Sequence, residues 1–152
     1  RIELIARGVL VRDRRVLLCR DVPEGYRYLP GGHVEFGEPA GEALAREWRE
    51  ETGLEARAGP LLAAIENIFT QKGKPRHEVL LVFHVEPTAP LPEPIPTLED
   101  DLAFDWIAID ELGDCAFRPT RMLAWLREHL ADGDRGPGAD TRGADWLDAS
   151  GA

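Results

Sequence analysis

The 152-residue chain has the length of one domain, and its 43% hydrophobic and 30% charged residues are ordinary for a soluble globular protein. These proportions exclude a collagenous, fibrous or fully disordered chain, and a domain of this size folds without needing a disulfide or a metal. The net charge of −10 argues against a protein that binds a nucleic acid duplex through its phosphates. An acidic protein that handles phosphates must present its basic groups locally or bind a metal cation.

The cysteines and the apolar runs indicate the cellular compartment in which the protein is expected. Cys19 and Cys115 stand far apart and outside any C-x-x-C pair, which suits a reducing cytoplasm better than a disulfide framework or a zinc ribbon. The first residues lack the apolar core of a signal peptide, and no apolar run approaches the ~20 residues of a membrane helix. We therefore expect a cytoplasmic protein without a membrane partner.

The first half of the chain predicts a strand hairpin and then a helix. Its expected elements are strands over 2–11 and 16–20, a brief extended piece at 33–36 and a helix over 40–52. Pro30-Gly31-Gly32 breaks any ladder between the hairpin and the helix. Pro39 suits the start of the helix and Gly53 its end.

The second half predicts further strands and a second helix. Its expected elements are strands over 61–69, 79–85 and 104–108, a polar loop over 70–76 and a helix over 119–130. Five prolines between Pro87 and Pro96 exclude regular structure there. Many short strands with two helices predict an α+β fold in which helices and a sheet form packed layers.

A domain over residues 1–131 is expected to precede a Gly/Asp-rich tail over 132–152. A tail of this composition does not order by itself, and Trp146-Leu147 is the apolar pair available to dock it. The docking surface is either the same chain or a partner subunit, so a homodimer stays open.

The first helix carries an unusual set of carboxylates. Three apolar side chains mark its inward face: Ala43, Leu44 and Trp48. At ~100° per residue, Glu47 and Glu51 fall inside that arc and Glu50 borders it. Buried carboxylates are costly unless compensated, and a hard divalent cation such as Mg²⁺ or Mn²⁺ would compensate them. The alternative is that all three are ordinary helix-forming glutamates on the surface.

Gly32, Glu38 and the run Arg46-Glu-Trp-Arg-Glu-Glu-Thr-Gly-Leu54 have the spacing G-x5-E-x7-R-E-U-x-E-E-x-G-U, in which U is apolar. With this motif the chain resembles the Nudix hydrolase family at every fixed position, although Trp48 is bulkier than the usual aliphatic residue. The resemblance covers about residues 2–130. It implies the Nudix fold, an α/β/α sandwich with a mixed central β-sheet.

The resemblance also implies the activity. Nudix enzymes hydrolyse nucleoside diphosphates linked to another moiety, and they bind Mg²⁺ or Mn²⁺ at the motif. Carried over, Glu47, Glu50 and Glu51 are implied as catalytic, metal-binding carboxylates, and the Gly31 carbonyl is a candidate further ligand. The general base is either Glu47 or an acidic residue of a later loop, for which the sequence offers Glu99, Asp100 and Asp101. The resemblance implies a bracing ion pair between Glu38 and Arg46.

Several residues outside the motif are candidates for substrate binding. Arg20 and Arg27 flank the loop before the paired glycines and could fork onto phosphate oxygens. His77 opens a strand after a Lys/Gly loop and could reach the substrate, and Arg7 is a weaker candidate. For each of them a solvated surface residue is the competing interpretation.

The substrate within the family is less determined. Thr70 and Gln71 stand where ADP-ribose hydrolases often carry a proline and dinucleoside-polyphosphate hydrolases a tyrosine. A nucleoside triphosphate or a nucleotide sugar therefore remains the expected small-molecule substrate. The alternative function is a catalytically silent Nudix-fold module that binds a nucleotide, and the intact Glu47, Glu50 and Glu51 favour the enzyme over it.

Overall fold

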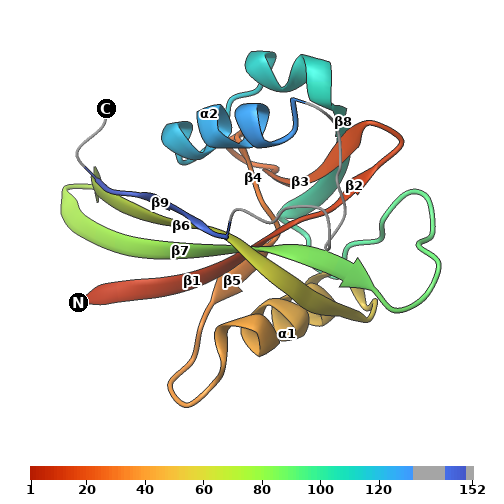
Figure 1. Cartoon of the computed structure of the whole chain (residues 1–152), viewed down its shortest axis with the longest axis horizontal. Helices are drawn as coiled ribbons and strands as arrows, with labels where there is room; N and C mark the ends of the chain where they lie inside the picture. The colour runs from red at the N-terminus through yellow and green to blue at the C-terminus, as the bar shows by residue number, and fades with distance from the viewer. Residues whose placement is uncertain (132–142, 150–152) are drawn as a thin grey trace.

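The computed structural model describes residues 1–131 and 143–149 (Figure 1). In chain order the elements are β1 (Ile2–Val9), β2 (Val11–Arg12), β3 (Arg15–Asp21), β4 (Arg27–Tyr28), β5 (Gly31–His33), α1 (Ala40–Thr52), β6 (Ala56–Gln71), β7 (Lys74–Pro87), β8 (Leu102–Ala108), the 3-10 helix η1 (Ile109–Asp114), α2 (Thr120–His129) and β9 (Asp145–Leu147).

The strands form two sheets. The larger sheet has the order β5-β1-β7-β6-β9 and is mixed, because β1 pairs parallel to β7 and β9 parallel to β6. In the smaller sheet β3 pairs antiparallel with β8 along one edge and with β2 and β4 along the other. The predicted α+β class with a mixed central sheet is confirmed.

The two helices cover opposite faces of the larger sheet (Figure 1). Helix α1 packs Leu44 and Trp48 into one apolar cluster, and α2 packs Met122 and Leu126 into the other. The predicted bounds of α1 are confirmed, and Gly53 ends it in the left-handed conformation with a φ of 76°. Among the residues that the structure describes, neither helix is long and apolar enough to cross a membrane.

The expected polar loop over 70–76 is largely wrong, because most of it belongs to strands. Strands β6 and β7 form one long hairpin in which Gln71 pairs with Lys74. Lys72 and Gly73 both have a positive φ, of 51° and 76°, which makes a two-residue turn that suits the twist of paired strands. The strand pairing therefore continues through polar residues, and their sequence lacks the alternation of apolar and polar residues that predicts a strand.

The described part of the tail docks as strand β9 beside β6, with Leu147 opposite Ile65. Leu147 packs against the cluster under α2, and Trp125 Nε1 donates a hydrogen bond of 3.0 Å to Asp145 Oδ2. Trp146 is 60% exposed, so its expected burial is wrong. Neighbouring residues of a strand point to opposite faces, and the face that takes Leu147 cannot also take Trp146. The rest of the predicted tail lies outside the described residues.

Candidate active site

Two glycines bring strand β5 against the last turns of α1. In the pairing of β5 with β1, Gly31 lies opposite Arg7 and Gly32 opposite Ala6. A Cβ on Gly32 would lie 2.7 Å from both carboxylate oxygens of Glu47. Gly31 has a φ of 138°, and a Cβ there would overlap the Ala6 carbonyl. Both positions therefore need glycine, because the backbone approaches its neighbours too closely for a side chain.

Glu51 is the buried carboxylate of this region. The residue is 7% exposed, and its Oε2 atom has no hydrogen-bond partner among the described residues. Burial raises the pKa of Glu51 to about 8, with a further upward contribution from Glu47 and a downward one from Arg7. The predicted inward position of this side chain is confirmed.

Glu47 and Glu50 lie in the same helix turns as Glu51 and are less buried. Burial raises the pKa of Glu47, although a hydrogen bond from Arg46 opposes the rise. The Glu50 side chain is 55% exposed and forms an ion pair of 3.2 Å with Arg46 Nη1. Glu50, predicted at the border of the inward arc, faces solvent, so it is not one of the buried carboxylates.

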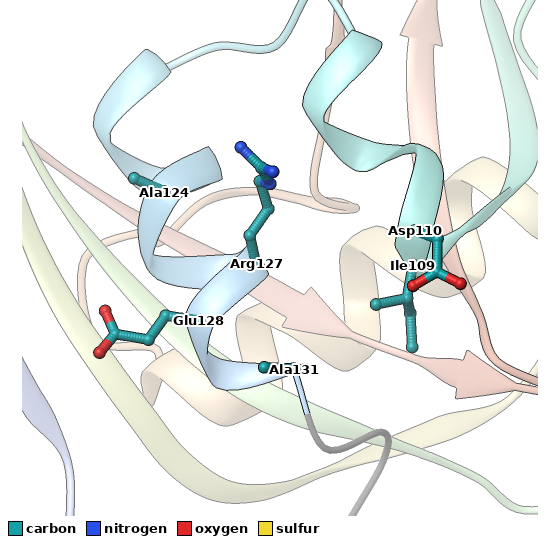
Figure 2. Close-up of a pocket in the computed structure, with 6 residues that line it drawn as sticks. All are labelled: Ile109, Asp110, Ala124, Arg127, Glu128 and Ala131. Carbon is teal, nitrogen blue, oxygen red and sulfur yellow. The ribbon is translucent and has the colours of Figure 1, made fainter.

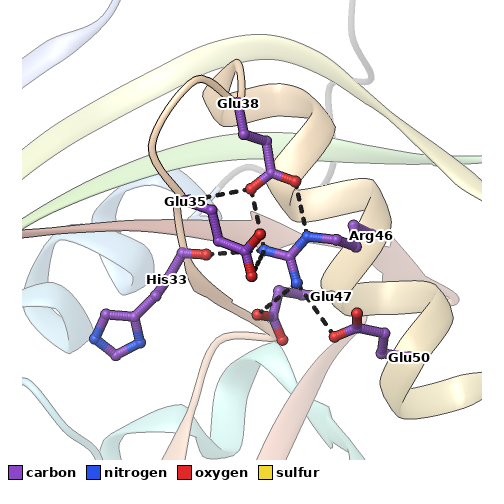
Figure 3. Close-up of polar contacts among 6 residues, drawn as sticks. All are labelled: His33, Glu35, Glu38, Arg46, Glu47 and Glu50. Atoms are coloured by element: carbon purple, nitrogen blue, oxygen red, sulfur yellow. Dashed lines mark hydrogen bonds and ion pairs between the residues drawn. The ribbon is translucent and has the colours of Figure 1, made fainter.

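Arg46 joins the loop after β5 to the helix (Figure 3). Its Nε and Nη2 atoms donate to the two carboxylate oxygens of Glu38 at 2.7 and 3.1 Å, and Nη2 also donates to the His33 carbonyl. Its Nη1 atom donates to Glu47 Oε1 at 3.1 Å. The ion pair between Glu38 and Arg46 is confirmed, and it holds the pKa of Glu38 below its usual range. This fork fixes the helix relative to the paired glycines.

The donors at this site suit a hard cation in their chemistry. They are carboxylate oxygens and a backbone carbonyl, and the unpartnered Glu51 Oε2 is a buried acceptor that a cation would satisfy. As the side chains stand, no three acidic, histidine or cysteine groups of the described residues gather closely enough to hold a metal ion. In this arrangement Arg46 pairs with both Glu47 and Glu50.

The proline-rich segment brings the acidic loop to the end of α1. Ile95 is buried in the cluster that packs against α1, and the Leu98 amide donates a hydrogen bond of 2.8 Å to the Glu51 carbonyl. The charge of the exposed Glu99 contributes to the raised pKa of Glu51. The structure therefore brings Glu99 to the carboxylate cluster, while its role as the base stays a prediction.

The two arginines predicted to bind substrate meet on a third residue. Arg20 Nε and Arg27 Nε donate to the same Asp105 oxygen at 2.8 and 3.0 Å. Burial would raise the pKa of Asp105, but these two hydrogen bonds outweigh it and keep the pKa low. Arg20 and Arg27 pair with each other, next to the pair of Cys19 with Tyr28. Because side chains alternate along a strand, the two arginines lie on the face of the smaller sheet opposite to Cys19 and Tyr28. The structure does not bring them onto the helix carboxylates.

His77 also lies away from α1. Its Nε2 atom is 2.9 Å from Glu66 Oε2, within the hairpin of β6 and β7. It pairs with Ile2 at the start of β1, five residues and therefore roughly 16 Å along the strand from Arg7. Substrate binding by His77 would need a ligand that extends to this end of the sheet.

Arg7, the weaker candidate for substrate binding, lies near the helix carboxylates. Its guanidinium lies 5.1 Å from the centroid of the Tyr28 ring, opposite Gly31. It is the cation whose charge lowers the pKa of Glu51 against the effect of burial. The signal in the sequence was a lone arginine in an otherwise largely apolar strand, where the structure half-buries it.

A cavity of about 540 Å³ lies elsewhere, between η1 and α2 (Figure 2). Its lining residues are Ile109, Asp110, Ala124, Arg127, Glu128 and Ala131. None of them belongs to α1 or β5, so this cavity is separate from the carboxylate cluster.

Comparisons with known proteins agree with this arrangement. The family model of the NUDIX domain matches residues 3–132. A MutT-like protein of Streptomyces ambofaciens is 32% identical over 91% of this chain and 80% of its own length. An ADP-ribose pyrophosphatase of Methanocaldococcus jannaschii is 33% identical over 50% of this chain and 46% of its own length. The crystal structure of a MutT NUDIX hydrolase from Burkholderia pseudomallei superposes with a TM-score of 0.68 at 30% identity, over 83% of this chain and 98% of that one.

Proposed function

Because the chain belongs to the Nudix family and is a pyrophosphohydrolase of that class, we propose that it hydrolyses the pyrophosphate linkage of small nucleoside diphosphate derivatives, using Mg²⁺ or Mn²⁺. The observation that carries the proposal is the buried Glu51 carboxylate beside Glu47 and the paired glycines. A buried carboxylate without a partner destabilises a fold. The presence of one next to the paired glycines therefore favours a ligand that neutralises its charge.

The residues that would hold the cation are Glu47, Glu50 and Glu51, with the Gly31 carbonyl as a further candidate. A bound divalent cation supplies the positive charge that an anionic diphosphate and its attacking water both need. A chain with a net charge of −10 repels such a substrate without that charge.

The other residues of the site hold the glutamates in position and accept the proton of the attacking water. Arg46 holds Glu38 and Glu47 in place and so fixes the distance between β5 and α1. A general base accepts a proton from the attacking water, and the candidates are Glu47 and Glu99, whose charges both raise the pKa of Glu51. Glu99 is the more exposed of the two.

A nucleoside triphosphate or a nucleotide sugar is the substrate we propose. The relative named as an ADP-ribose pyrophosphatase supports a linked nucleoside diphosphate as the substrate class. Thr70 stands where many ADP-ribose hydrolases carry a proline, which favours the first two classes over ADP-ribose itself.

A phosphate-release panel tests the proposal. The purified chain is incubated with Mg²⁺ or Mn²⁺ and with nucleoside triphosphates, nucleotide sugars, ADP-ribose and dinucleotides. Glu51→Gln should reduce the rate on the best substrate at least ~10²-fold, about 2.7 kcal/mol of transition-state stabilisation. Glu42→Gln is the matched control, because Glu42 is an exposed glutamate of the same helix. A Glu51→Gln enzyme with near-full activity at saturating substrate would contradict the site assignment.

A further inference from the structure

Arg7 differs from the other half-buried arginines of the described residues in having no protein acceptor. Arg12, Arg15, Arg20, Arg27, Arg46, Arg76 and Arg121 each form an ion pair or a hydrogen bond with a protein oxygen. For Arg7 the recorded contact is with an aromatic ring, that of Tyr28. A half-buried guanidinium has five donors and loses free energy when they find no acceptor.

The position of Arg7 places this unsatisfied cation at the candidate active site. It lies opposite Gly31 in the ladder of β1 with β5, one strand spacing or about 5 Å away. The neighbouring Gly32 is the residue at which a Cβ would overlap the Glu47 carboxylate. The contact with the Tyr28 ring restricts the Arg7 guanidinium, so less side-chain entropy is lost when it binds an anion.

We propose that Arg7 is a phosphate-binding residue of the substrate site, donating its guanidinium fork to the non-bridging oxygens of the diphosphate. The proposal rests on the proposed hydrolase function. Among the described residues, Arg7 is the half-buried arginine that lacks a protein acceptor, and in this proposal it binds the anion. Glu47, Glu50 and Glu51 would bind the cation. An anion that lies between Arg7 and a cation bound at the glutamates then has positive charge on both sides.

The test measures binding of magnesium inorganic diphosphate by calorimetry, and KM and kcat on the best substrate of the panel. Arg7→Gln removes the charge, and Arg7→Lys keeps the charge but loses the fork. Arg12→Gln is the matched control, because Arg12 also stacks on a ring, at 5.0 Å from the Trp106 centroid, but pairs with Glu93. Melting temperatures show whether each variant is folded.

We expect Arg7→Gln to weaken diphosphate binding and raise KM at least ~10-fold, with Arg7→Lys in between and Arg12→Gln unchanged. Binding of Mn²⁺ alone should stay the same or tighten in Arg7→Gln, because a positive charge has left the neighbourhood of Glu51. Diphosphate binding within twofold of wild type in Arg7→Gln, or a loss equal to that in Arg12→Gln, would overturn the proposal. A wild-type chain that hydrolyses no compound of the panel would instead overturn the proposed function.

Discussion

Glu51 makes the stability of the fold depend on protons and on cations. Its pKa of about 8 in the folded chain lies above the ordinary value of 4.5. Between these two values the folded chain binds a proton that the unfolded chain has released, so stability falls as the pH rises through this window. Above it both states are ionised, and the loss is on the order of a few kcal/mol.

We therefore expect the metal-free protein to melt at a lower temperature at about pH 8.5 than at about pH 5.5. Glu51→Gln should remove most of this dependence, and Mg²⁺ should restore stability to the wild type at the higher pH. The low pKa values of Glu38 and Asp105 act in the opposite direction and at lower pH, and they are common to both proteins. Scanning calorimetry in a chelator measures the difference, and equal pH dependence in the two proteins would sink the explanation.

Glu99 is the second residue with a specific expectation. The hydrogen bond from Leu98 to Glu51 fixes the start of the acidic loop at the end of α1. We expect Glu99→Ala to lower kcat strongly with a modest change in KM, while Asp100→Ala and Asp101→Ala are mild. Steady-state kinetics of the three variants decides this. Three equally mild variants would return the base to Glu47.

At the level of elements, local signals predict α1 well and long-range contacts poorly. The apolar period, Pro39 and Gly53 give the bounds of α1, because each acts within one or two turns. The partner of Arg20 and Arg27 was not predictable, because Asp105 reaches them through the pairing of β3 with β8. The motif was evident from its spacing along the chain, whereas the hydrogen bond from the Leu98 amide to the Glu51 carbonyl needed the folded geometry.

Strand β9 gives a prediction with an internal control. Leu147→Asp places a charge against the cluster under α2 and should destabilise the fold by about 1–3 kcal/mol. Trp146→Ser changes a larger side chain that is 60% exposed and should stay within about 0.5 kcal/mol. Chemical denaturation of both variants measures the contrast. Two equal losses would mean that Trp146 has a contact beyond this chain, as in a dimer.

At the scale of the whole molecule, the net charge affects the rate at which an anionic substrate associates with the protein. A net charge of −10 opposes the approach of an anionic nucleotide, and salt screens that repulsion over a Debye length of ~10 Å at 0.1 M. We expect kcat/KM at fixed free Mg²⁺ to rise as NaCl increases from about 10 to about 100 mM. Initial rates at low substrate measure it, with Arg12→Gln as a control of altered charge. A fall in kcat/KM would show that the local field of Arg7 dominates the approach.

The parallel ladder between β1 and β7 has a consequence for synthesis on the ribosome. Ile2 pairs with His77 and Val9 with His84, so the first strand of this sheet waits for a strand that is made about 70 residues later. The hairpin of β6 with β7 is local and can form at once, and only then does β1 gain its central neighbour. Until that moment the cluster that buries Ile5 and Val9 lacks Leu80 and Val82, so both side chains stay partly unburied. Because β5 is held by β1, the paired glycines meet Glu47 only after β1 is in place, so this part of the site waits for β7 as well.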